Sequence, residues 1–278
     1  MESLRQGRWG FRPAARGIAR GLVGIFCLGL GLPAFGWTPE MQRRIADEAA
    51  RLGPRDLYRQ IDKHRPEFEQ GALAPFSDRD PGRHSRNPDG SGTLDKTVTE
   101  EAAAAIAAIR DHRPFAEIVG RLGRVSHYVA DANNPLAVSN QDAEEGRYFA
   151  DFLIYAESAE PRLPLVFYGL PRGWDRRPDL SALVRDAFSR SRGFYPAIGR
   201  EYRRIDFGSG RALFDDRSSA FAIASLAFSH AVTDAAIALR TIWLQAGGGD
   251  ERSHLPTAGE GILTVPKSDE RADRRQGR

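Results

Sequence analysis

The sequence has a single cysteine, Cys27, among its 278 residues. One cysteine cannot form a disulfide within the chain, and no Cys-x-x-Cys pair is present to hold a metal. The sequence also lacks a Gly-rich phosphate loop and a Gly-x-Ser-x-Gly nucleophile elbow, which removes two common bases for nucleotide binding and ester hydrolysis. Any metal site must therefore use histidine, carboxylate or backbone atoms.

The first 36 residues have the composition of a secretory signal peptide. Five arginines precede an apolar run from Gly21 to Leu32, and the small residues of Ala34-Phe35-Gly36 follow it. This order is typical of a cleaved leader, and the run is shorter than a membrane-spanning helix requires. We therefore expect residues 1–36 to be removed and the protein to be periplasmic or extracellular. The alternative is an uncleaved amphipathic anchor.

Residues 37–278 carry no excess of positive charge. The whole sequence has a formal charge of +3, and the leader contributes five arginines and Glu2, so the mature chain has a charge of −1. Its removal also removes Cys27. The mature chain thus gives no electrostatic signal for nucleic-acid binding.

Alternation with a period of two is scarce, whereas apolar residues recur at the three- and four-residue steps of helices. This pattern predicts helices at 40–52, at 56–69, from a Thr97 or Thr99 cap through 109, from Pro114 to Asn133, at 142–158, at 180–191, at 194–205, and from a Ser218 or Ser219 cap to 245. The last helix is apolar on nearly all sides, which predicts a central buried position. We expect a long loop at 71–93 and an extended segment or loop at 162–174. The prediction is an all-α fold with one domain at 37–246 and a disordered charged tail at 247–278.

One short motif carries the chemistry of the sequence. His127 and Asp131 are four residues apart, so both side chains lie on one face of a helix. An imidazole and a carboxylate side by side can both bind a divalent transition metal, although a structural hydrogen-bonded pair has the same spacing. The sequence Asn133-Asn134-Pro135 then ends the helix, because Asn tolerates left-handed geometry and Pro cannot continue the helix.

Further residues extend this motif into a pattern. Cleavage of the leader exposes Trp37, a loop rich in Gly, Pro and Asp carries His84, and the final helix carries Trp243. Together with the run from His127 to Leu136, these features resemble the bacterial zinc-dependent phospholipase C family, whose fold is shared by single-strand-specific fungal nucleases. The likeness covers most of the mature chain.

The resemblance implies an all-α domain in which clustered zinc ions split a phosphodiester, with a phospholipid as one substrate class. It implies that the metal is held by the side chains of His84, His127 and Asp131 and by the backbone of Trp37. Adjacent cations suit this chemistry because they stabilise the charge that gathers on phosphate oxygens.

The chain also departs from the family pattern at several ligand positions. A family histidine in the first helix falls near Gln42, a loop aspartate near Phe76, and the histidine after the core proline at Ala137. Asp78 or Asp80 could replace the loop aspartate. The family's His-x-x-x-Glu on the fifth helix has no histidine here, and its region holds only Glu144, Glu145 and Asp151. We therefore expect one zinc ion, or at most two, in place of three.

The last helix repeats the four-residue spacing with His230 and Asp234. His230 could reach the metal site and replace a lost ligand. The alternative, which we favour, is a buried histidine satisfied by Asp234 or by a backbone group, because an apolar helix must pair its few polar side chains.

Two functional hypotheses follow from the sequence. One is a secreted metal-dependent phosphodiester hydrolase with a reduced zinc site. The other is a binding or structural protein that keeps the fold after losing catalysis.

Overall fold

The computed structural model describes residues 36–249 and 263–264. Apart from Gly36, the predicted signal peptide lies outside these residues, as does most of the predicted tail. The α-helices of the described part are α1 (Pro39–Leu52), α2 (Arg55–Lys63), α3 (Arg65–Leu73), α4 (Leu94–Arg110), α5 (Phe115–Ala132), α6 (Phe149–Ala159), α7 (Leu180–Arg204), α8 (Gly210–Leu213) and α9 (Ser219–Gln245).

The predicted all-α class is confirmed for the described residues. Their only strands are β1 (Val166–Phe167) and β2 (Leu263–Thr264), which form a two-stranded antiparallel pair. β1 lies inside the segment that was predicted to be extended or a loop. β2 belongs to the stretch that was predicted to be disordered, so at least two residues of that stretch are paired with the folded domain.

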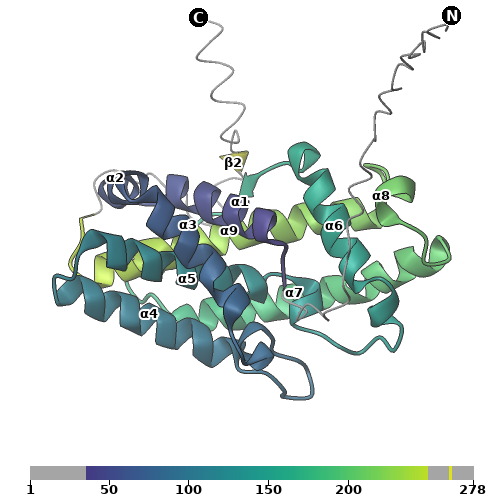
Figure 1. The fold of residues 1–278 in the computed structure, drawn as a ribbon, viewed down its shortest axis with the longest axis horizontal. Coiled ribbons are helices and arrows are strands. Elements are labelled where there is room, and N and C mark those ends of the chain that lie inside the picture. The colour runs from purple at the N-terminus through teal and green to yellow at the C-terminus, as the bar shows by residue number, and fades with distance from the viewer. Residues whose placement is uncertain (1–35, 250–262, 265–278) are drawn as a thin grey trace, which may run out of the picture. The chain divides into compact units, whose positions relative to one another are not determined.

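Helices α5 and α9 form the centre of the protein (Figure 1). α5 packs against α3, α4 and α9, and α9 also packs against α1 and α7. The 27-residue α9 is long and apolar enough to cross a membrane, but most of it is buried among the other helices. It is therefore the core helix that its composition predicts. Its first turn is capped by Ser218, whose side chain accepts a hydrogen bond from the backbone N–H of Phe221.

The prediction of one helix at 56–69 is wrong, because the chain breaks at His64 into α2 and α3. Pro66 follows at the start of α3. Proline has no N–H to donate and its ring disfavours helical geometry in the residue before it, so it fits a first turn and not a helix interior. The expected long loop also starts later, since α3 continues to Leu73.

Two helix starts differ from the prediction. α4 begins at Leu94 with Thr93 as its N-cap residue, so neither Thr97 nor Thr99 caps it. Both threonines instead donate to backbone carbonyls inside the helix, which a hydroxyl can do at interior positions. α6 begins at Phe149, several residues after the predicted start, and a short 3-10 turn precedes it.

The two helices predicted at 180–191 and 194–205 form one continuous helix, α7, which passes through Pro196. Gly193 and Pro196 favour a break, but Tyr195, Ile198 and Gly199 are buried within the fold. Tertiary packing of this apolar face therefore outweighs the local preference of the chain.

Helices α3 and α5 cross with their backbones in close contact at three glycines. A Cβ atom added at Gly71 would lie 2.0 Å from the carbonyl oxygen of Gly120, and one added at Gly123 would lie 2.2 Å from that of Phe68. Only glycine at positions 71 and 123 permits this approach. The crossing brings the C-terminal end of α3 against the second half of α5, where His127 lies.

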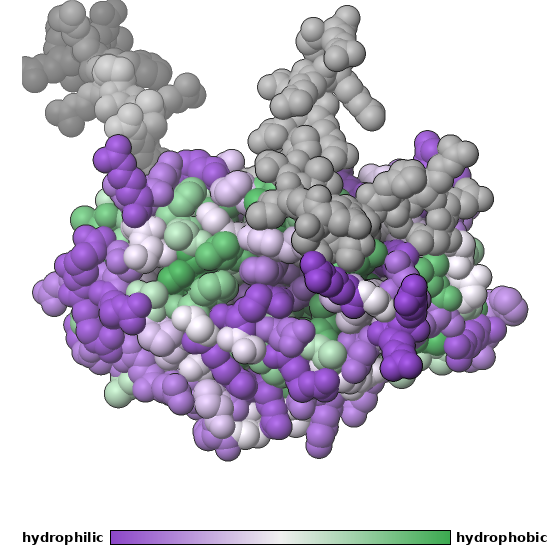
Figure 2. Space-filling view, turned by 180° about the vertical axis from the view of Figure 1, so that it is seen from behind, coloured by the Kyte–Doolittle hydropathy of each residue, from purple (hydrophilic) through white to green (hydrophobic). Residues whose placement is uncertain are grey.

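The surface seen from behind is largely hydrophilic, with smaller apolar areas between the charged side chains (Figure 2). Among the described residues, the most exposed large apolar side chains are Phe115, Ile154, Leu213 and Leu226. They come from four different helices, and scattered exposure of this kind is ordinary for a folded domain.

Candidate metal centre

The structure brings together three of the residues that the sequence singles out. One ligand atom each from His84, His127 and Asp131 lies within 4.8 Å of the others. His127 and Asp131 come from the last two turns of α5, and His84 comes from the 3-10 turn Pro81–His84. All three are buried, with exposed fractions of 0–1%. Among the described residues this is the only cluster of its kind.

The ring of His127 is oriented by the end of α3. Its Nδ1 lies 2.7 Å from the carbonyl oxygen of Ala72. This carbonyl belongs to the last turn of α3, where carbonyls lack partners within the helix. Because a carbonyl can only accept, Nδ1 carries a proton, and Nε2, which faces Asp131, is the nitrogen that can bind a metal once it is unprotonated. The glycine crossing of α3 and α5 therefore fixes the orientation of this imidazole ring.

His84 is oriented in a similar way from the other side. Its Nε2 lies 3.1 Å from the carbonyl oxygen of Pro75, and its Nδ1 lies 2.8 Å from Oδ2 of Asp131. A proton on Nε2 satisfies the carbonyl and leaves Nδ1 as the atom that can bind a metal. A histidine ligand whose second nitrogen is held by a backbone carbonyl is common in metal sites.

The three facing atoms have the spacing of a zinc coordination sphere. Nε2 of His127 is 3.3 Å from Nδ1 of His84 and 3.3 Å from Oδ2 of Asp131. Ligand atoms about 2.0 Å from a zinc ion at tetrahedral angles are about 3.3 Å apart. The contact of 2.8 Å between His84 and Asp131 is shorter and requires a small adjustment. The donor set of two imidazoles and one carboxylate also suits zinc.

The two histidines also set the charge of Asp131. Burial by itself favours the neutral acid, but in the metal-free protein the positive charge of protonated His127 and the hydrogen bonds from the rings of His127 and His84 outweigh it and lower the pKa of Asp131. The carboxylate is therefore ionised at neutral pH, which is the form that binds a metal.

Gln42 on α1 occupies the second oxygen of Asp131. Its Nε2 donates to Oδ1 of Asp131 at 2.8 Å, while its Oε1 is buried and has no hydrogen-bond partner among the described residues. The resemblance places a family histidine near Gln42. The structure shows it as a hydrogen-bond donor to the carboxylate.

The N-terminal segment lies against the same carboxylate. A Cβ atom added at Gly36 would lie 2.7 Å from Oδ1 of Asp131 and 3.3 Å from the Cβ of Ala137. The indole of Trp37 is buried and donates to the carbonyl oxygen of Ala130 at 2.9 Å. The side chain of Trp37 thus anchors this segment beside the cluster, while a metal-binding role for its backbone stays a prediction.

Two positions at which the resemblance expects a metal ligand, Phe76 and Ala137, also border the cluster. The ring of Phe76 meets the ring of His127 edge to face, with centroids 5.0 Å apart. Ala137 is buried and contributes a methyl group. Apolar groups therefore stand where the resemblance requires metal ligands.

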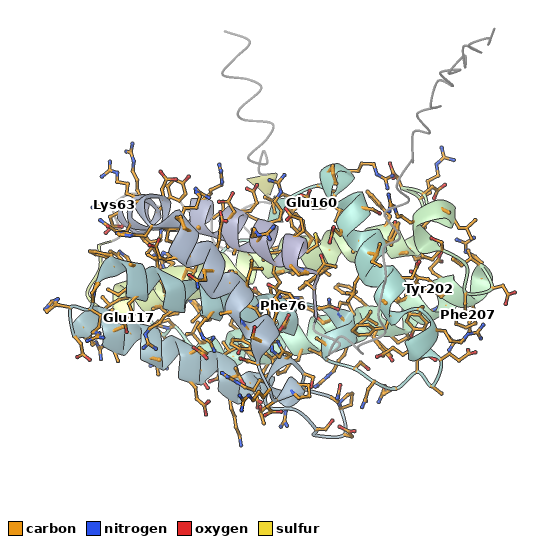
Figure 3. The ribbon with its side chains drawn as sticks, viewed as in Figure 1. Lys63, Phe76, Glu117, Glu160, Tyr202 and Phe207 are labelled. Atoms are coloured by element: carbon orange, nitrogen blue, oxygen red, sulfur yellow. The ribbon has the colours of Figure 1, made fainter. Side chains whose placement is uncertain are left out.

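The acidic residues of the predicted fifth helix belong to a different part of the structure. Asp151 accepts hydrogen bonds from the hydroxyl of Tyr202 at 2.6 Å and from the backbone N–H of Gly210 at 2.7 Å. Glu145 accepts one from Tyr195. Figure 3 places Tyr202 near α6 and α7, well apart from Phe76. These carboxylates hold helices together there.

The second His-x-x-x-Asp pair does not join the cluster. Oδ2 of Asp234 accepts hydrogen bonds from Asn133 and Arg190, and the ring of His230 stacks on Tyr168 with centroids 4.0 Å apart. Of the two partners predicted for His230, Asp234 instead binds Arg190 on α7 and Asn133 beyond α5, while a backbone partner for His230 stays a prediction.

No family model matches this chain, and no curated protein matches it. The assignment to the zinc-dependent phospholipase C family therefore stays a prediction from the residues.

The sequence alone did not reveal the carbonyls of Ala72 and Pro75 that orient the histidines. A usable signal was present in the three glycines Gly71, Gly120 and Gly123, which indicate a close approach of two helices. The partner helices, however, could not be paired from one sequence.

Proposed function

We propose that this protein is an exported zinc-binding protein whose single ion is held by His84, His127 and Asp131. The supporting observation is the convergence of three buried donor atoms at about the separations of a tetrahedral site. Backbone carbonyls hold the outer nitrogen of each histidine, so the inner nitrogens are directed at a common point.

A single ion fits the structure better than two or three. Oδ1 of Asp131 is taken by the amide of Gln42, and Phe76 and Ala137 offer no donor atom. The remaining residues provide ligands for one ion only, which agrees with the lower of the two expected numbers.

The first candidate role for the ion is hydrolysis of a phosphodiester, with phospholipids as one substrate class. Three protein ligands leave one coordination position free, as in catalytic zinc sites. A bound zinc ion would supply Lewis-acid stabilisation of phosphate charge. In this role His84, His127 and Asp131 would hold the ion.

The second candidate role is stabilisation of the fold, and the burial of the cluster favours it. All three ligand side chains are at most 1% exposed in the full chain, the ring of Phe76 covers His127, and the indole of Trp37 binds the neighbouring carbonyl of Ala130. Structural zinc sites are closed in this way. The geometry therefore supports metal binding best, with a binding or structural role for the protein ahead of catalysis.

Zinc analysis of the purified mature protein tests the proposal. We expect about one equivalent of zinc per chain, since structural and catalytic sites retain their metal through purification. His127→Ala removes one ligand and should lose the ion. His230→Ala is the matched control, because it removes a histidine outside the cluster and should retain the ion. A wild-type content below about a tenth of an equivalent contradicts the proposal.

Hydrolysis assays on the same samples separate the two roles. The substrates are bis(p-nitrophenyl) phosphate and phosphatidylcholine. Zinc-dependent hydrolysis that disappears in His127→Ala supports the hydrolase, whereas full zinc content without hydrolysis supports the structural or binding role.

A further inference from the structure

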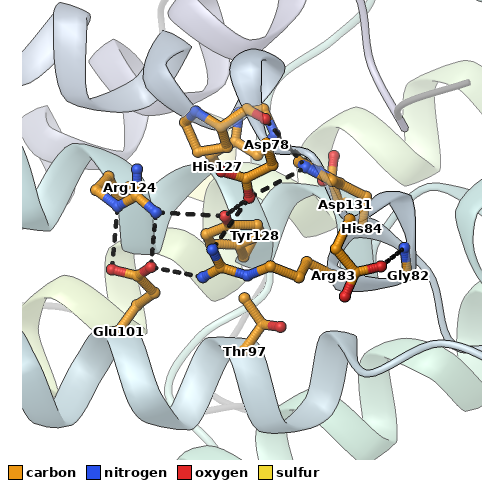
Figure 4. A network of polar contacts seen from close by, with 12 residues as sticks. Asp78, Gly82, Arg83, His84, Thr97, Glu101, Arg124, His127, Tyr128 and Asp131 are labelled. Carbon is orange, nitrogen blue, oxygen red and sulfur yellow. Dashed lines mark hydrogen bonds and ion pairs between the residues drawn. The ribbon is translucent and has the colours of Figure 1, made fainter. Parts of the chain in front are cut away.

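A network of charged and aromatic side chains lies beside the candidate zinc ligands (Figure 4). Asp78, which follows the 3-10 turn Ala74–Ser77, is its link to the cluster. Oδ2 of Asp78 lies 3.5 Å from Nε2 of His84 and 3.3 Å from a terminal nitrogen of Arg83. The hydroxyl of Tyr128 donates a hydrogen bond to the same oxygen.

The position of Asp78 excludes it as a ligand of the same ion. It faces Nε2 of His84, whereas Asp131 faces Nδ1 on the other side of the ring. The sequence suggested Asp78 as a replacement ligand, and the structure instead places it behind the histidine. Asp80, the other suggested replacement, caps the backbone N–H of Gly82 at 2.8 Å.

Two helices hold Asp78 in this place. Tyr128 follows His127 directly on α5, so the helix that supplies two ligands also fixes the carboxylate. Glu101 on α4 binds Arg83 at 2.8 Å and Arg124 at 2.8 and 3.1 Å. Arg83 is thereby fixed beside Asp78. The carboxylate of Asp78 is only 12% exposed, which limits screening by solvent.

We propose that Asp78 is a positioning residue that holds His84 with Nε2 protonated and Nδ1 directed at the metal. This inference rests on the proposed zinc site. Nε2 is flanked by the carbonyl oxygen of Pro75 and the carboxylate of Asp78, and both groups only accept hydrogen bonds. They favour the tautomer in which Nε2 carries the proton and Nδ1, which faces Asp131, can bind the ion. The negative charge also strengthens the imidazole as a donor, and loss of such outer partners lowers metal affinity about 10- to 100-fold.

Cobalt binding to the full mature chain tests this role. Co²⁺ replaces zinc in sites of this donor set and its visible absorption reports ligand geometry, which zinc cannot do because its d shell is full. Competition with a chelator gives the affinity. Asp78→Asn keeps the size of the side chain and removes the charge. We expect affinity to fall about 10- to 100-fold and the visible bands to shift.

Asp80→Asn is the matched control. It makes the same change two residues away, and asparagine caps a turn as well as aspartate does. We expect its affinity and spectrum to equal those of the wild type. An equal loss in both variants, or no loss in Asp78→Asn, overturns the inference.

Tyr128→Phe provides an independent variant if Asp78→Asn does not fold. It removes only the hydroxyl that fixes Asp78, and we expect a smaller loss of affinity with a shifted spectrum. Unchanged affinity in this variant also overturns the inference. A wild-type chain that binds no Co²⁺ and no zinc contradicts the proposed function itself, whereas a binding wild type with an unaffected Asp78→Asn contradicts only the role of Asp78.

Discussion

Asp131 and Asp234 are buried carboxylates whose pKa values shift in opposite directions. Burial opposes ionisation of both. For Asp131 the two histidines outweigh burial and lower the pKa. For Asp234 burial prevails over Arg190 and Asn133 and raises the pKa to about 6. His230, one turn before Asp234, has its pKa lowered to about 4 by burial and by the charge of Arg190.

Asp234 and His230 should give opposite pH dependences of stability in the metal-free protein. Asp234 has a folded pKa above its unfolded value, so its effect makes the protein less stable as pH rises from about 4 to 6. His230 has a folded pKa below its unfolded value, so its effect makes the protein less stable as pH falls from about 6.5 to 4. Asp234→Asn should leave a stability that rises with pH over this range, and His230→Gln one that falls.

Urea unfolding between pH 4 and 6.5 with a chelator present measures both slopes. The wild type should be flatter than either variant, because its two contributions oppose each other. If the free energy of unfolding varies with pH in the same way in all three proteins, the pKa values of Asp234 and His230 are not shifted as described.

At the scale of elements, the crossing of α3 and α5 connects the fold to the site. The glycines let the two backbones touch, and this contact delivers the carbonyl of Ala72 to His127. The end of α3 also leads into the turn that carries Pro75 and Phe76. A small displacement of α3 therefore changes the orientation of the histidine ligands.

Gly123→Ala should destabilise the protein by about 1–3 kcal/mol, since the added methyl group meets the backbone of α3. Gly120→Ala is the control on the same helix, because its Cβ would meet the nearest atom at an ordinary 3.5 Å. Alanine is also the better helix former, so this control should be neutral or stabilising. Denaturant unfolding measures the change in the free energy of unfolding for each variant. Equal destabilisation by the two substitutions would contradict the close approach of α3 and α5 at Gly123.

The sequence predicted most helices but not all of their ends, for physical reasons visible in single residues. The apolar faces of α1, α5 and α9 gave their positions, because periodicity reports which side of a helix is buried. The break at His64 and the continuity of α7 through Pro196 were not predicted. At His64 the chain starts a new helix because Pro66 fits the first turn of α3. At Pro196 tertiary packing keeps α7 continuous.

The candidate site was predicted in its residues but not in its contacts. His84, His127 and Asp131 are local signals, since each residue type has metal-binding chemistry and two share a helix face. The partners of Asp131 and the pairing of Asp234 with Arg190 depend on which helices are neighbours. That information resides in long-range packing, which a single sequence shows only weakly.

At the scale of the whole molecule, one ion would connect α5 with the turn before α4. Residues in these two segments are more than forty positions apart. A ligand that binds only the folded state stabilises it by about 2.7 kcal/mol when its concentration is 100 times Kd. Because α5 contacts most of the central helices, an ion bound to it would stabilise the folded core as a whole.

Zinc should therefore raise the melting temperature of the metal-free protein by roughly 5–10 °C, given about 2–4 °C per kcal/mol for a domain of this size. Calorimetry with and without zinc measures the shift. His127→Ala should show no shift, and a shift of equal size in that variant would place the ion elsewhere.

The contact of Gly36 with Asp131 has a practical consequence for recombinant production. A version made without the predicted leader needs an initiator methionine or the end of an affinity tag at position 36. Any side chain there would begin 2.7 Å from Oδ1 of Asp131 and press on the carboxylate. A tag that ends in glycine, or one that a protease removes to leave Trp37 as the first residue, keeps the candidate metal ligands in place.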